Sequence, residues 1–557
     1  MCDRKVGILI IVLLFVWAGA LFSQSQILWQ VDDQGNITKN GEPFQIRGAS
    51  WTGLQGREEM DKLSAMGQAP MEMYIGNVFW AESSRNYDSD IAEIKAIGFN
   101  TIRLPLVPQT LNPKDSMGRA PYLDNADSVQ IENSRLALET VIKKLDEAGI
   151  YVVLDLHSCS NYVSWRAGRL DARPPYPDKN YDKYDFLRED CSCAQFDNPN
   201  GVTNIQKYSM AMWLNDLQTL AALGDQLGVS NIMGIDIFNE PFDYSWEEWR
   251  YLVDEAYAAI LPVNTNILIF VEGVSSQAGV QNINSGIYGL VPHGDPDTKP
   301  SWGENLFEAG ENAPNIPKDH LVYSPHCFGP SIYVQSMFVK QDQVQCQGLE
   351  GDAVGDMKCS IIINRNLLEK GWDEHFGYLK KMGYAVVIGA FGGNPTWPNK
   401  AELRDQDRYS YLNDKTVDWQ WQNVFVDYLI SRDIRDSFYW AINPEEFSSD
   451  GIFTHAYDPV KNEAAFGIWL EPDAKKLELL KRLWEGKMIE HKIGDVNNDS
   501  FVNIIDALLI AQYYVALPVT MEADDSGDVN CDGKVNIIDA LLVAQHYVGL
   551  RGPFFCI

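Results

Sequence analysis

The residues best suited to chemistry stand at the end of a short apolar run. Ile232-Met233-Gly234-Ile235 has the composition of a buried strand and leads into Asp236-Ile237-Phe238-Asn239-Glu240-Pro241. A carboxyl group at the end of a buried strand is held rigidly and can act as a general acid or base. We therefore take Glu240 as the first candidate catalytic residue, in preference to a surface glutamate that only caps a helix.

A second chemical pattern occurs twice near the C-terminus. Two segments that begin 33 residues apart, at Asp495 and Asp528, place side-chain oxygens at positions 1, 3, 5, 9 and 12 of a loop. Calcium needs six to eight oxygen ligands gathered by a tight turn, so the spacing predicts two calcium loops. Asp replaces the usual Glu at position 12, and Gly533 at position 6 occurs only in the second loop. The expected ligands, with a backbone carbonyl at position 7, are Asp495, Asn497, Asp499, Phe501, Asn503, Asp506, Asp528, Asn530, Asp532, Lys534, Asn536 and Asp539.

The elements that must position Glu240 recur in a regular order. Eight short apolar or β-branched runs alternate with helix-like stretches such as 128–148 and 209–227. This alternation predicts an α/β fold with a single (β/α)8 barrel, followed by a small all-α module built from the two loop-helix repeats. The expected strands are 44–49, 101–106, 151–156, 233–238, 267–271, 321–324, 385–389 and 437–441.

Polar or aromatic residues end several of these runs. In a (β/α)8 barrel the C-terminal ends of the strands carry the active site, so these residues should lie together. A doubly wound sheet would instead carry a Gly-rich phosphate loop, and the sequence has none. The long connections 159–208 and 273–320 should build cleft walls. The strand-end residues are Arg103, His157, Asn239, Glu240, His326 and Trp440.

Length, charge and the N-terminus limit the function. A net charge of −32 over 557 residues disfavours binding to nucleic acid or to anionic membranes. Arg4-Lys5 precede an apolar run with the small residues Ala18-Gly19-Ala20, which predicts a signal peptide over 1–22 and a secreted protein; a retained membrane anchor is the alternative. We expect the barrel over 27–487 and the C-terminal module over 490–552.

An exported protein can form disulfides. Nine cysteines are present, and removal of Cys2 with the signal peptide leaves eight. Cys346 could bridge to Cys359, and Cys531 to Cys556. The spacing of cysteines and histidines does not indicate zinc. The cysteines without an expected partner are Cys159, Cys191, Cys193 and Cys327.

Seven short motifs occur in order on the successive strands. Over residues 30 to 487 they resemble glycoside hydrolase family 5, of the cellulase (endo-β-1,4-glucanase) type. The resemblance implies Glu240 as acid/base, Asn239 on the sugar 2-hydroxyl and Trp440 under the sugar, with Arg103, His157 and His326 around a second carboxylate. The motifs are Arg47-Gly48-Ala49-Ser50-Trp51, Asn100-Thr101-Ile102-Arg103-Leu104-Pro105, Leu154-Asp155-Leu156-His157, Asn239-Glu240-Pro241, Val271-Glu272-Gly273-Val274, Ser324-Pro325-His326 and Phe438-Tyr439-Trp440.

The second carboxylate of this family is missing. Retaining glycosidases place it about 5 Å from the acid/base, where it attacks the sugar. The family pattern Ile-Gly-Glu-Phe-Gly reads Ile388-Gly389-Ala390-Phe391-Gly392 here, so Ala390 takes the place of the catalytic nucleophile. The segment 383–399 contains no Asp or Glu. Phe328 also replaces a family tyrosine, and two departures together favour natural divergence over one engineered substitution.

The duplicated loop-helix resembles a type I dockerin, the module that attaches enzymes to cohesins of a scaffold protein. Its helices are expected over 507–514 and 540–547. Family dockerins often have Ser or Thr at loop positions 10 and 11. Ile504-Ile505 and Ile537-Ile538 stand there instead, which leaves the type of cohesin open.

Together these expectations describe a secreted protein of an extracellular or cell-surface complex. Its barrel would bind cellulose or a related β-glucan, with retaining endo-hydrolysis as the parent reaction and poor hydrolysis because of Ala390. It would need no catalytic cofactor and no nucleic-acid or membrane partner. The alternatives are a non-catalytic glucan-binding component and a mannanase or xyloglucanase. Two or three cleft platforms for sugars are expected among Trp51, Trp80, Trp165, Trp302 and Trp397.

Overall fold

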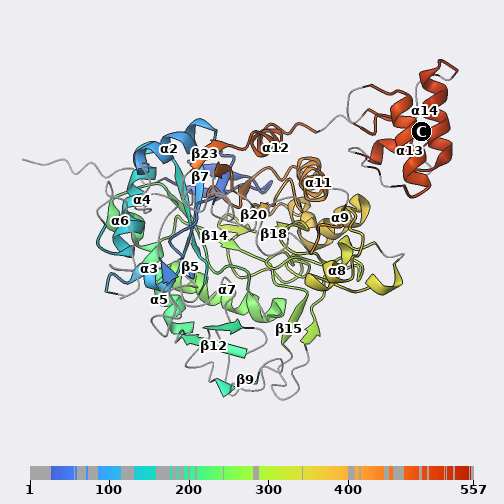
Figure 1. The fold of residues 1–557 in the computed structure, drawn as a ribbon. Coiled ribbons are helices and arrows are strands. Elements are labelled where there is room, and N and C mark those ends of the chain that lie inside the picture. Colours follow the sequence, from blue (N-terminus) through green and yellow to red (C-terminus); the bar gives the residue numbers. More distant parts are fainter. Residues whose placement is uncertain are drawn as a thin grey trace, which may run out of the picture.

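The computed structural model describes residues from Ile27 to Gly552 with gaps (Figure 1). The predicted signal peptide lies outside the described residues. Within the described part of the chain, no helix combines the length and the hydrophobicity that crossing a membrane requires. The longer gaps are 59–70, 73–85, 115–130, 159–175, 178–184, 187–192, 280–287, 399–407 and 456–468.

One parallel sheet of ten strand segments forms the centre of the larger domain. The sixth and seventh strands are each split in two, as β17 and β18 and as β19 and β20. The pairing β17–β19 lies at one end of the strand order and β18–β20 at the other, so the sheet closes on itself. The predicted (β/α)8 barrel is therefore confirmed. Its segments are β4 (Arg47–Ser50), β7 (Thr101–Leu106), β8 (Tyr151–Leu156), β13 (Ile232–Asp236), β14 (Leu268–Val271), β17 (Leu321–Tyr323), β18 (His326–Phe328), β19 (Ala385–Val386), β20 (Ile388–Gly392) and β21 (Ser437–Tyr439).

Most strand bounds differ from the prediction by one to three residues. The second and third strands have the predicted bounds. The seventh was expected to end at Gly389, but β20 continues to Gly392 because it pairs with β18 through Ala390 and His326. Ala390 thus lies inside a strand, whereas the prediction placed it just beyond one.

Helices surround the barrel (Figure 1). The helix expected from 128 begins at Ser134, because the side chain of Asn133 accepts a hydrogen bond from Leu136 N and caps it. The helix expected over 209–227 is divided at Ala222. The helices are α2 (Tyr87–Ala96), α3 (Pro108–Leu111), α4 (Ser134–Ala148), α5 (Met210–Ala221), α6 (Leu223–Leu227), α7 (Trp246–Ile260), α8 (Asp352–Asp356), α9 (Arg365–Trp372), a π-helix (Asp373–Gly377), α10 (Tyr378–Lys381), α11 (Val417–Ser431) and α12 (Ala474–Glu485), with short 3-10 turns at Ser336–Phe338 and Val344–Cys346.

Small antiparallel sheets complete this domain. Among the described residues, a three-stranded sheet comes from the N-terminal part, and five two-stranded sheets lie in the connections. The two long connections predicted as cleft walls carry β9 to β12 and β15 to β16. The strands are β1 (Trp29–Val31), β2 (Ile37–Lys39), β3 (Glu42–Pro43), β5 (Arg57–Glu58), β6 (Met71–Glu72), β9 (Tyr176–Pro177), β10 (Asp185–Phe186), β11 (Cys193–Asp197), β12 (Gly201–Gln206), β15 (Gln277–Gly279), β16 (Tyr288–Leu290), β22 (Phe453–His455) and β23 (Trp469–Pro472).

The inside of the barrel is apolar at one end and polar at the other. Val153, Phe270 and Phe438 belong to one buried cluster with Trp29 and Ile37 of the N-terminal sheet. This cluster fills the N-terminal end of the barrel, and a larger core lies between the strands and the helices. The polar strand ends are thereby confined to the C-terminal end, where the site is expected.

The C-terminal module has its own apolar core around Val496, Ile510, Val529 and Val543. Its helices are α13 (Ile504–Tyr514) and α14 (Ile537–Tyr547), with a 3-10 turn at Asp524–Gly527. Both helices begin three residues earlier than predicted. The amide oxygens of Asn503 and Asn536 cap them by accepting hydrogen bonds from Ile505 N and Ile538 N, at 2.7 and 2.8 Å.

One predicted disulfide is present, between Cys346 and Cys359. Cys327 is free and buried. The other predicted pair, Cys531 and Cys556, lies outside the described residues.

A buried carboxyl group in α11 binds the backbone of the loop after β18 and should make stability depend on pH. Asp418 accepts hydrogen bonds from Ser331 N at 2.9 Å and from the Gln422 amide at 2.8 Å. Burial raises the pKa of Asp418 to about 6, although these bonds and Lys476 oppose the rise. The folded protein therefore holds a proton more tightly than the unfolded chain, so this contribution to stability is full below pH 4 and is lost as pH rises to about 6.

Replacing Asp418 by Asn should remove up to about 3 kcal/mol of this pH dependence, since one pKa unit corresponds to about 1.4 kcal/mol. Urea unfolding of both proteins from pH 4 to pH 7 measures the difference. Parallel stability curves for the two proteins would contradict the assignment.

Candidate active site

The guanidinium of Arg103 is the centre of a buried cluster at the C-terminal end of the barrel. Its Nη2 lies 3.1 Å from Asp155, 2.9 Å from Asp236 and 3.0 Å from Glu272, and it also donates to Asn239 Oδ1 at 3.1 Å. These residues come from or directly follow β7, β8, β13 and β14. Four neighbouring strands therefore place one cation among three carboxyl groups.

The charges of this cluster do not balance if every acid is ionised. Burial raises the pKa of Asp236 and of Glu272 well above the ordinary range, and neighbouring carboxylates add to the rise while Arg103 opposes it. Burial alone would lower the pKa of Arg103, but the surrounding carboxylates raise it. Arg103 consequently stays charged, and the raised pKa values favour a proton on the acidic side of the cluster.

Glu240 lies at the edge of this cluster. Its carboxylate is 3.2 Å from His326 Nδ1, and its side chain is 11% exposed, whereas that of Glu272 is fully buried. Glu240 has a φ of +44°, which is unusual for a residue other than glycine, and its backbone N–H donates to Glu272 Oε2 at 2.7 Å. Glu272 thus holds the strained backbone of a solvent-accessible carboxylate.

His157 and Trp440 form one wall of the site. Their rings are stacked with centroids 5.3 Å apart and an interplanar angle of 8°. His157 Nδ1 lies 2.8 Å from Asp155, which fixes the imidazole and leaves Nε2 for another partner. The six predicted strand-end residues are thus brought together through direct contacts or through shared partners.

Ala390 lies in β20 opposite His326 of β18 and is buried. The described segment 383–398 places no carboxylate beside it. Glu272 is a candidate for a substitute, but both of its oxygens are engaged, by Arg103 and by Glu240 N, and it has no exposed surface. Glu272 cannot reach a ligand without breaking these contacts.

Asp236, Glu272 and His326 also satisfy the distances of a metal-ligating group, with one atom of each within 4.8 Å of the others. Arg103 already supplies the positive charge at this place, at 2.9 Å from Asp236 and 3.0 Å from Glu272. A second cation there would be repelled, so we assign no metal to this cluster.

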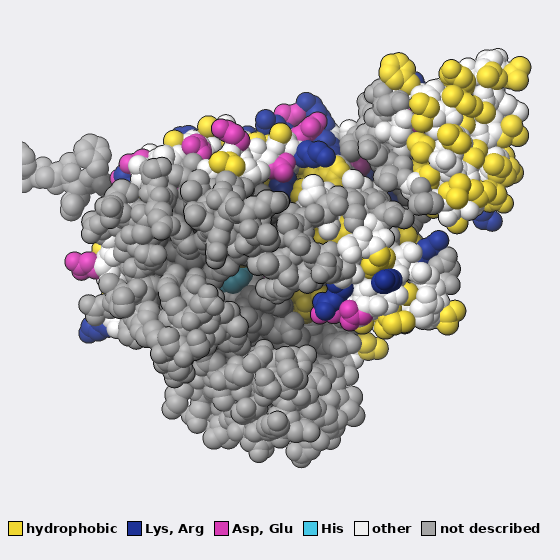
Figure 2. All heavy atoms as spheres, in the orientation of Figure 1, with side chains coloured by type: hydrophobic (Ala, Val, Ile, Leu, Met, Phe, Trp, Pro, Cys, Tyr) yellow, Lys and Arg dark blue, Asp and Glu magenta, His cyan; other side chains and the backbone are white. Residues whose placement is uncertain are grey.

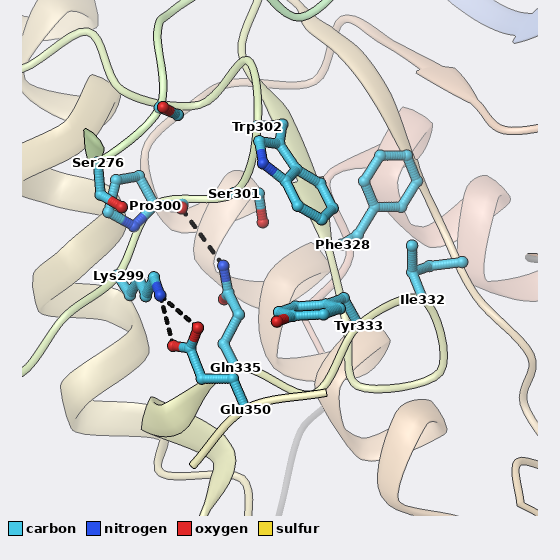
Figure 3. Close-up of a pocket in the computed structure, with 11 residues that line it drawn as sticks. Ser276, Lys299, Pro300, Ser301, Trp302, Phe328, Ile332, Tyr333, Gln335 and Glu350 are labelled. Carbon is cyan, nitrogen blue, oxygen red and sulfur yellow. Dashed lines mark hydrogen bonds and ion pairs between the residues drawn. The ribbon is translucent and has the colours of Figure 1, made fainter. Parts of the chain in front are cut away.

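A pocket of about 300 Å³ opens beside the cluster, between the ends of β14 and β18 (Figure 3). Trp302, Phe328 and Tyr333 line one side, and Trp302 and Tyr333 have ring centroids 5.4 Å apart. Lys299 and Glu350 form an ion pair on the other side. An apolar face opposite a polar face suits a sugar ring, which has apolar faces and a rim of hydroxyl groups.

The predicted tryptophan platforms have different outcomes. Trp302 lines the pocket, whereas Trp51 is fully buried in the core and Trp397 is nearly so. Trp80 and Trp165 lie outside the described residues.

Three site residues received no role from sequence reasoning. Asp155, Asp236 and Glu272 each stand at or just after a strand end, the same signal that identified His157 and Glu240. Glu272 in particular was part of a matching motif. An acid within a short apolar strand is costly to bury alone, and this could have suggested a shared cation such as Arg103.

Gly303 packs against the buried cluster, and a side chain at this position should disturb the cluster. A Cβ added to Gly303 would lie 2.7 Å from Glu272 Oε2 and 3.3 Å from both Glu240 Cγ and His326 Cβ. Gly149 has a similar φ, +72° against +77°, but nothing lies within 4 Å of its added Cβ. Gly303→Ala should therefore cost about 1–3 kcal/mol more stability than Gly149→Ala, because only the first is overpacked. Denaturant unfolding of both variants measures this, and equal losses would contradict it.

The aspartates at position 12 of the two C-terminal loops accept corresponding backbone hydrogen bonds. Asp506 accepts hydrogen bonds from Val496 N at 3.0 Å and Asn503 N at 2.8 Å, and Asp539 does so from Val529 N and Asn536 N at 3.1 and 2.8 Å. Of the twelve predicted ligands, Asp499 and Asp532 lie outside the described residues.

Two family models match the chain. Residues 39–446 match the model described as cellulase (glycosyl hydrolase family 5). Residues 493–547 match the model of the dockerin type I domain. The two matches fall on the barrel and on the C-terminal module.

Characterised relatives agree with these matches. Endoglucanase C of Cellvibrio japonicus is 46% identical over 463 residues, which cover 82% of this chain and 62% of that protein. The major extracellular endoglucanase of Xanthomonas campestris is 26% identical, over 74% of this chain and 65% of that protein. The chain therefore spans less than two thirds of the length of either relative.

The solved catalytic domain of the Xanthomonas campestris major endoglucanase has the same fold. Its TM-score is 0.53 at 23% identity, and the match covers 82% of this chain and 99% of that domain.

Proposed function

Because the chain belongs to the cellulase family, glycosyl hydrolase family 5, we propose that its barrel binds β-1,4-glucan in the manner of an endoglucanase. One observation carries the proposal: the site combines a solvent-accessible carboxylate, Glu240, with the stacked rings of His157 and Trp440. Glu240 is the acid/base, Asn239 contacts the sugar 2-hydroxyl, and Trp440 lies under the sugar at the cleavage point. The pocket beside Phe328 extends the binding surface along the glucan.

We further propose that hydrolysis is impaired in this chain. A retaining reaction forms a bond from a carboxylate oxygen to the anomeric carbon while Glu240 protonates the departing oxygen. Ala390 cannot form that bond. Within the described part of the chain, Arg103 Nη1 is buried and has no hydrogen-bond partner, which agrees with the loss of an acceptor from the site. The chain should then still bind the glucan but cleave it inefficiently.

A matched pair of variants tests the binding surface. Trp440→Ala should weaken cellohexaose binding about tenfold, since loss of an aromatic platform costs about 1–2 kcal/mol. Trp419→Ala, at a half-buried tryptophan on α11, should leave the affinity unchanged. Isothermal titration calorimetry measures both. No saturable binding by the parent chain at millimolar ligand would refute the proposal.

The choice of polysaccharide needs a separate comparison. The test compares carboxymethylcellulose, mannan and xyloglucan. We expect this chain to bind carboxymethylcellulose best, and Ala390→Glu to hydrolyse it fastest. A preference for mannan or xyloglucan would select the alternative enzyme of the same family. Reducing-sugar release by the parent chain within a hundredfold of ordinary cellulases would reject impaired hydrolysis.

The dockerin module is proposed to bind two calcium ions. Each loop offers only oxygen donors, which calcium prefers. Asp495 and Asp506 are both buried, and burial together with the charge of Asp495 raises the pKa of Asp506. Asp528 raises the pKa of Asp539 in the same way. Carboxylates that repel one another at short range would be stabilised by a divalent cation between them.

The same module is proposed to attach the protein to a cohesin, outside the cell. Figure 2 shows hydrophobic side chains gathered over its surface. Ile504 and Ile537 are 50% and 47% exposed, and Leu508 and Leu541 are 55% and 56% exposed. A monomer rarely exposes so many large apolar residues without a partner. Isoleucines at loop positions 10 and 11 favour a cohesin with an apolar contact surface.

A further inference from the structure

The segment 298–305, here called the covering segment, lies over the candidate active site. The carbonyl of Gly303 accepts hydrogen bonds from Gly273 N at 2.8 Å and His326 N at 3.3 Å. Asn305 pairs with Val274 through two backbone hydrogen bonds of 3.0 Å. The covering segment is thus attached to the residues that follow β14 and to the first residue of β18, and its Trp302 faces the pocket (Figure 3).

A buried carboxylate inside the covering segment fixes its shape. Glu304 is 2% exposed and accepts a hydrogen bond from Ser301 N at 2.7 Å, which closes a turn around Trp302 and Gly303. The same carboxylate lies 2.7 Å from His375 Nδ1. It also accepts a hydrogen bond from the thiol of Cys327, whose pKa is raised by burial and by Glu304. Glu304 therefore joins the turn to a strand end and to a helix.

His375 closes the arrangement from the other side. Its Nε2 lies 3.2 Å from Thr298 Oγ1, at the beginning of the covering segment, and its carbonyl accepts a hydrogen bond from Leu306 N at 3.0 Å. His375 belongs to the π-helix Asp373–Gly377, a local widening of the helix that is frequent at functional sites. The imidazole of His375 thus contacts Thr298 at the start of the covering segment and Glu304 near its end.

Neither residue can touch a ligand in the pocket, because His375 is 1% exposed and Glu304 is 2% exposed. Polar side chains are expensive to bury without partners, and these two bond to each other and to the covering segment. Their side-chain hydrogen bonds lead to that segment, to each other or to Cys327, next to His326, and the His375 ring also packs edge-on against His293, with centroids 6.0 Å apart. A role confined to general packing would not require this convergence.

We propose that Glu304 and His375 are positioning residues that set Trp302 in the sugar pocket and Gly303 against Glu240. They act on glucan binding through the covering segment without contact to the sugar. The proposal rests on the proposed binding of β-glucan by the barrel and adds the residues that tune it.

The test compares cellohexaose affinity in variants of the full chain by calorimetry. Glu304→Gln should weaken binding about tenfold, and His375→Asn about threefold, because the asparagine amide can still donate to Glu304. Asp373→Asn is the matched control: it lies on the same π-helix and pairs with Arg432 at 2.7 Å, away from the pocket. It should lower thermal stability and leave the affinity within about twofold.

A double-mutant cycle separates positioning from general damage. In the Trp302→Ala background, Glu304→Gln should cost less than about twofold in affinity, since the group that it positions is gone. An unchanged affinity in Glu304→Gln, or a tenfold loss that persists without Trp302, would overturn the proposal. If the parent chain binds no cellohexaose, the proposed glucan binding fails, and the hold of Glu304 on the covering segment is then decided without sugar.

A second measurement needs no sugar and keeps the proposal testable in that case. The Cys327 thiol should be protected from a thiol reagent in the parent chain and in Asp373→Asn. It should react at least about tenfold faster in Glu304→Gln, as mass-spectrometric mapping of the labelled peptide would show. Equal protection of Cys327 in all three proteins would mean that Glu304 does not hold the covering segment.

Discussion

Restoring a carboxylate by Ala390→Glu should raise the hydrolysis of carboxymethylcellulose by on the order of 10⁴-fold or more, because loss of a catalytic nucleophile costs on that scale. Position 390 pairs with His326, which lies 3.2 Å from Glu240. A reducing-sugar assay on the two proteins measures the gain.

Two controls accompany this variant. Ala390→Gln has nearly the same shape and no charge, so it should remain as slow as the parent chain. Phe328→Tyr alone should do little, because there is no carboxylate for its hydroxyl to orient, and in combination with Ala390→Glu it should add a smaller gain. Equal activity of Ala390→Glu and Ala390→Gln would show that the carboxylate is not the missing group.

Removal of calcium should abolish cohesin binding while the barrel stays folded. The dockerin core is separate from the two barrel clusters, so each part should have its own thermal transition. Without a cation, the paired acids Asp495 and Asp506 repel one another. We expect the affinity for cohesin to fall about 10³-fold. Calcium at about 1,000 times its own dissociation constant stabilises the folded module by that factor, and EGTA removes this stabilisation.

A calorimetric scan with and without EGTA, together with cohesin titration, measures this effect in the full chain. Asp528→Ala should mimic EGTA in part, since it removes a side-chain ligand of the second loop. Lys534→Ala is the matched control, because position 7 contributes only its backbone carbonyl. Cohesin binding that persists in EGTA would contradict the calcium assignment.

The barrel could be predicted from the sequence because each strand carries its own local signal. The runs at 101–106 and 151–156 are short and mostly apolar, and both ends of each strand are correct. The bounds of the seventh strand were wrong because its last residues are fixed by pairing with β18, a segment far away in sequence. Pairing of this kind becomes visible only after the barrel closes.

The candidate site could be predicted in part for the same reason. Arg103, His157, Glu240, His326 and Trp440 stand at strand ends, and fold geometry alone gathers them. The partners that fix their orientation could not be predicted. Glu272 acts on the backbone of Glu240, and Glu304 meets His375 across 71 residues of chain. Such contacts depend on burial and side-chain direction, which motif spacing does not encode.

The most direct test of the central claim, that Ala390 stands where a nucleophile is needed and Glu240 remains functional, uses azide with an activated aryl β-cellobioside. Azide is small enough to attack the anomeric carbon in place of the absent carboxylate, while the aryl oxygen leaves with the bonding electrons. We expect a rate that depends on azide concentration and an α-glycosyl azide as the product, identified by nuclear magnetic resonance. Rapid azide-independent release of cellobiose in the β configuration would contradict it, because another residue would then be the nucleophile.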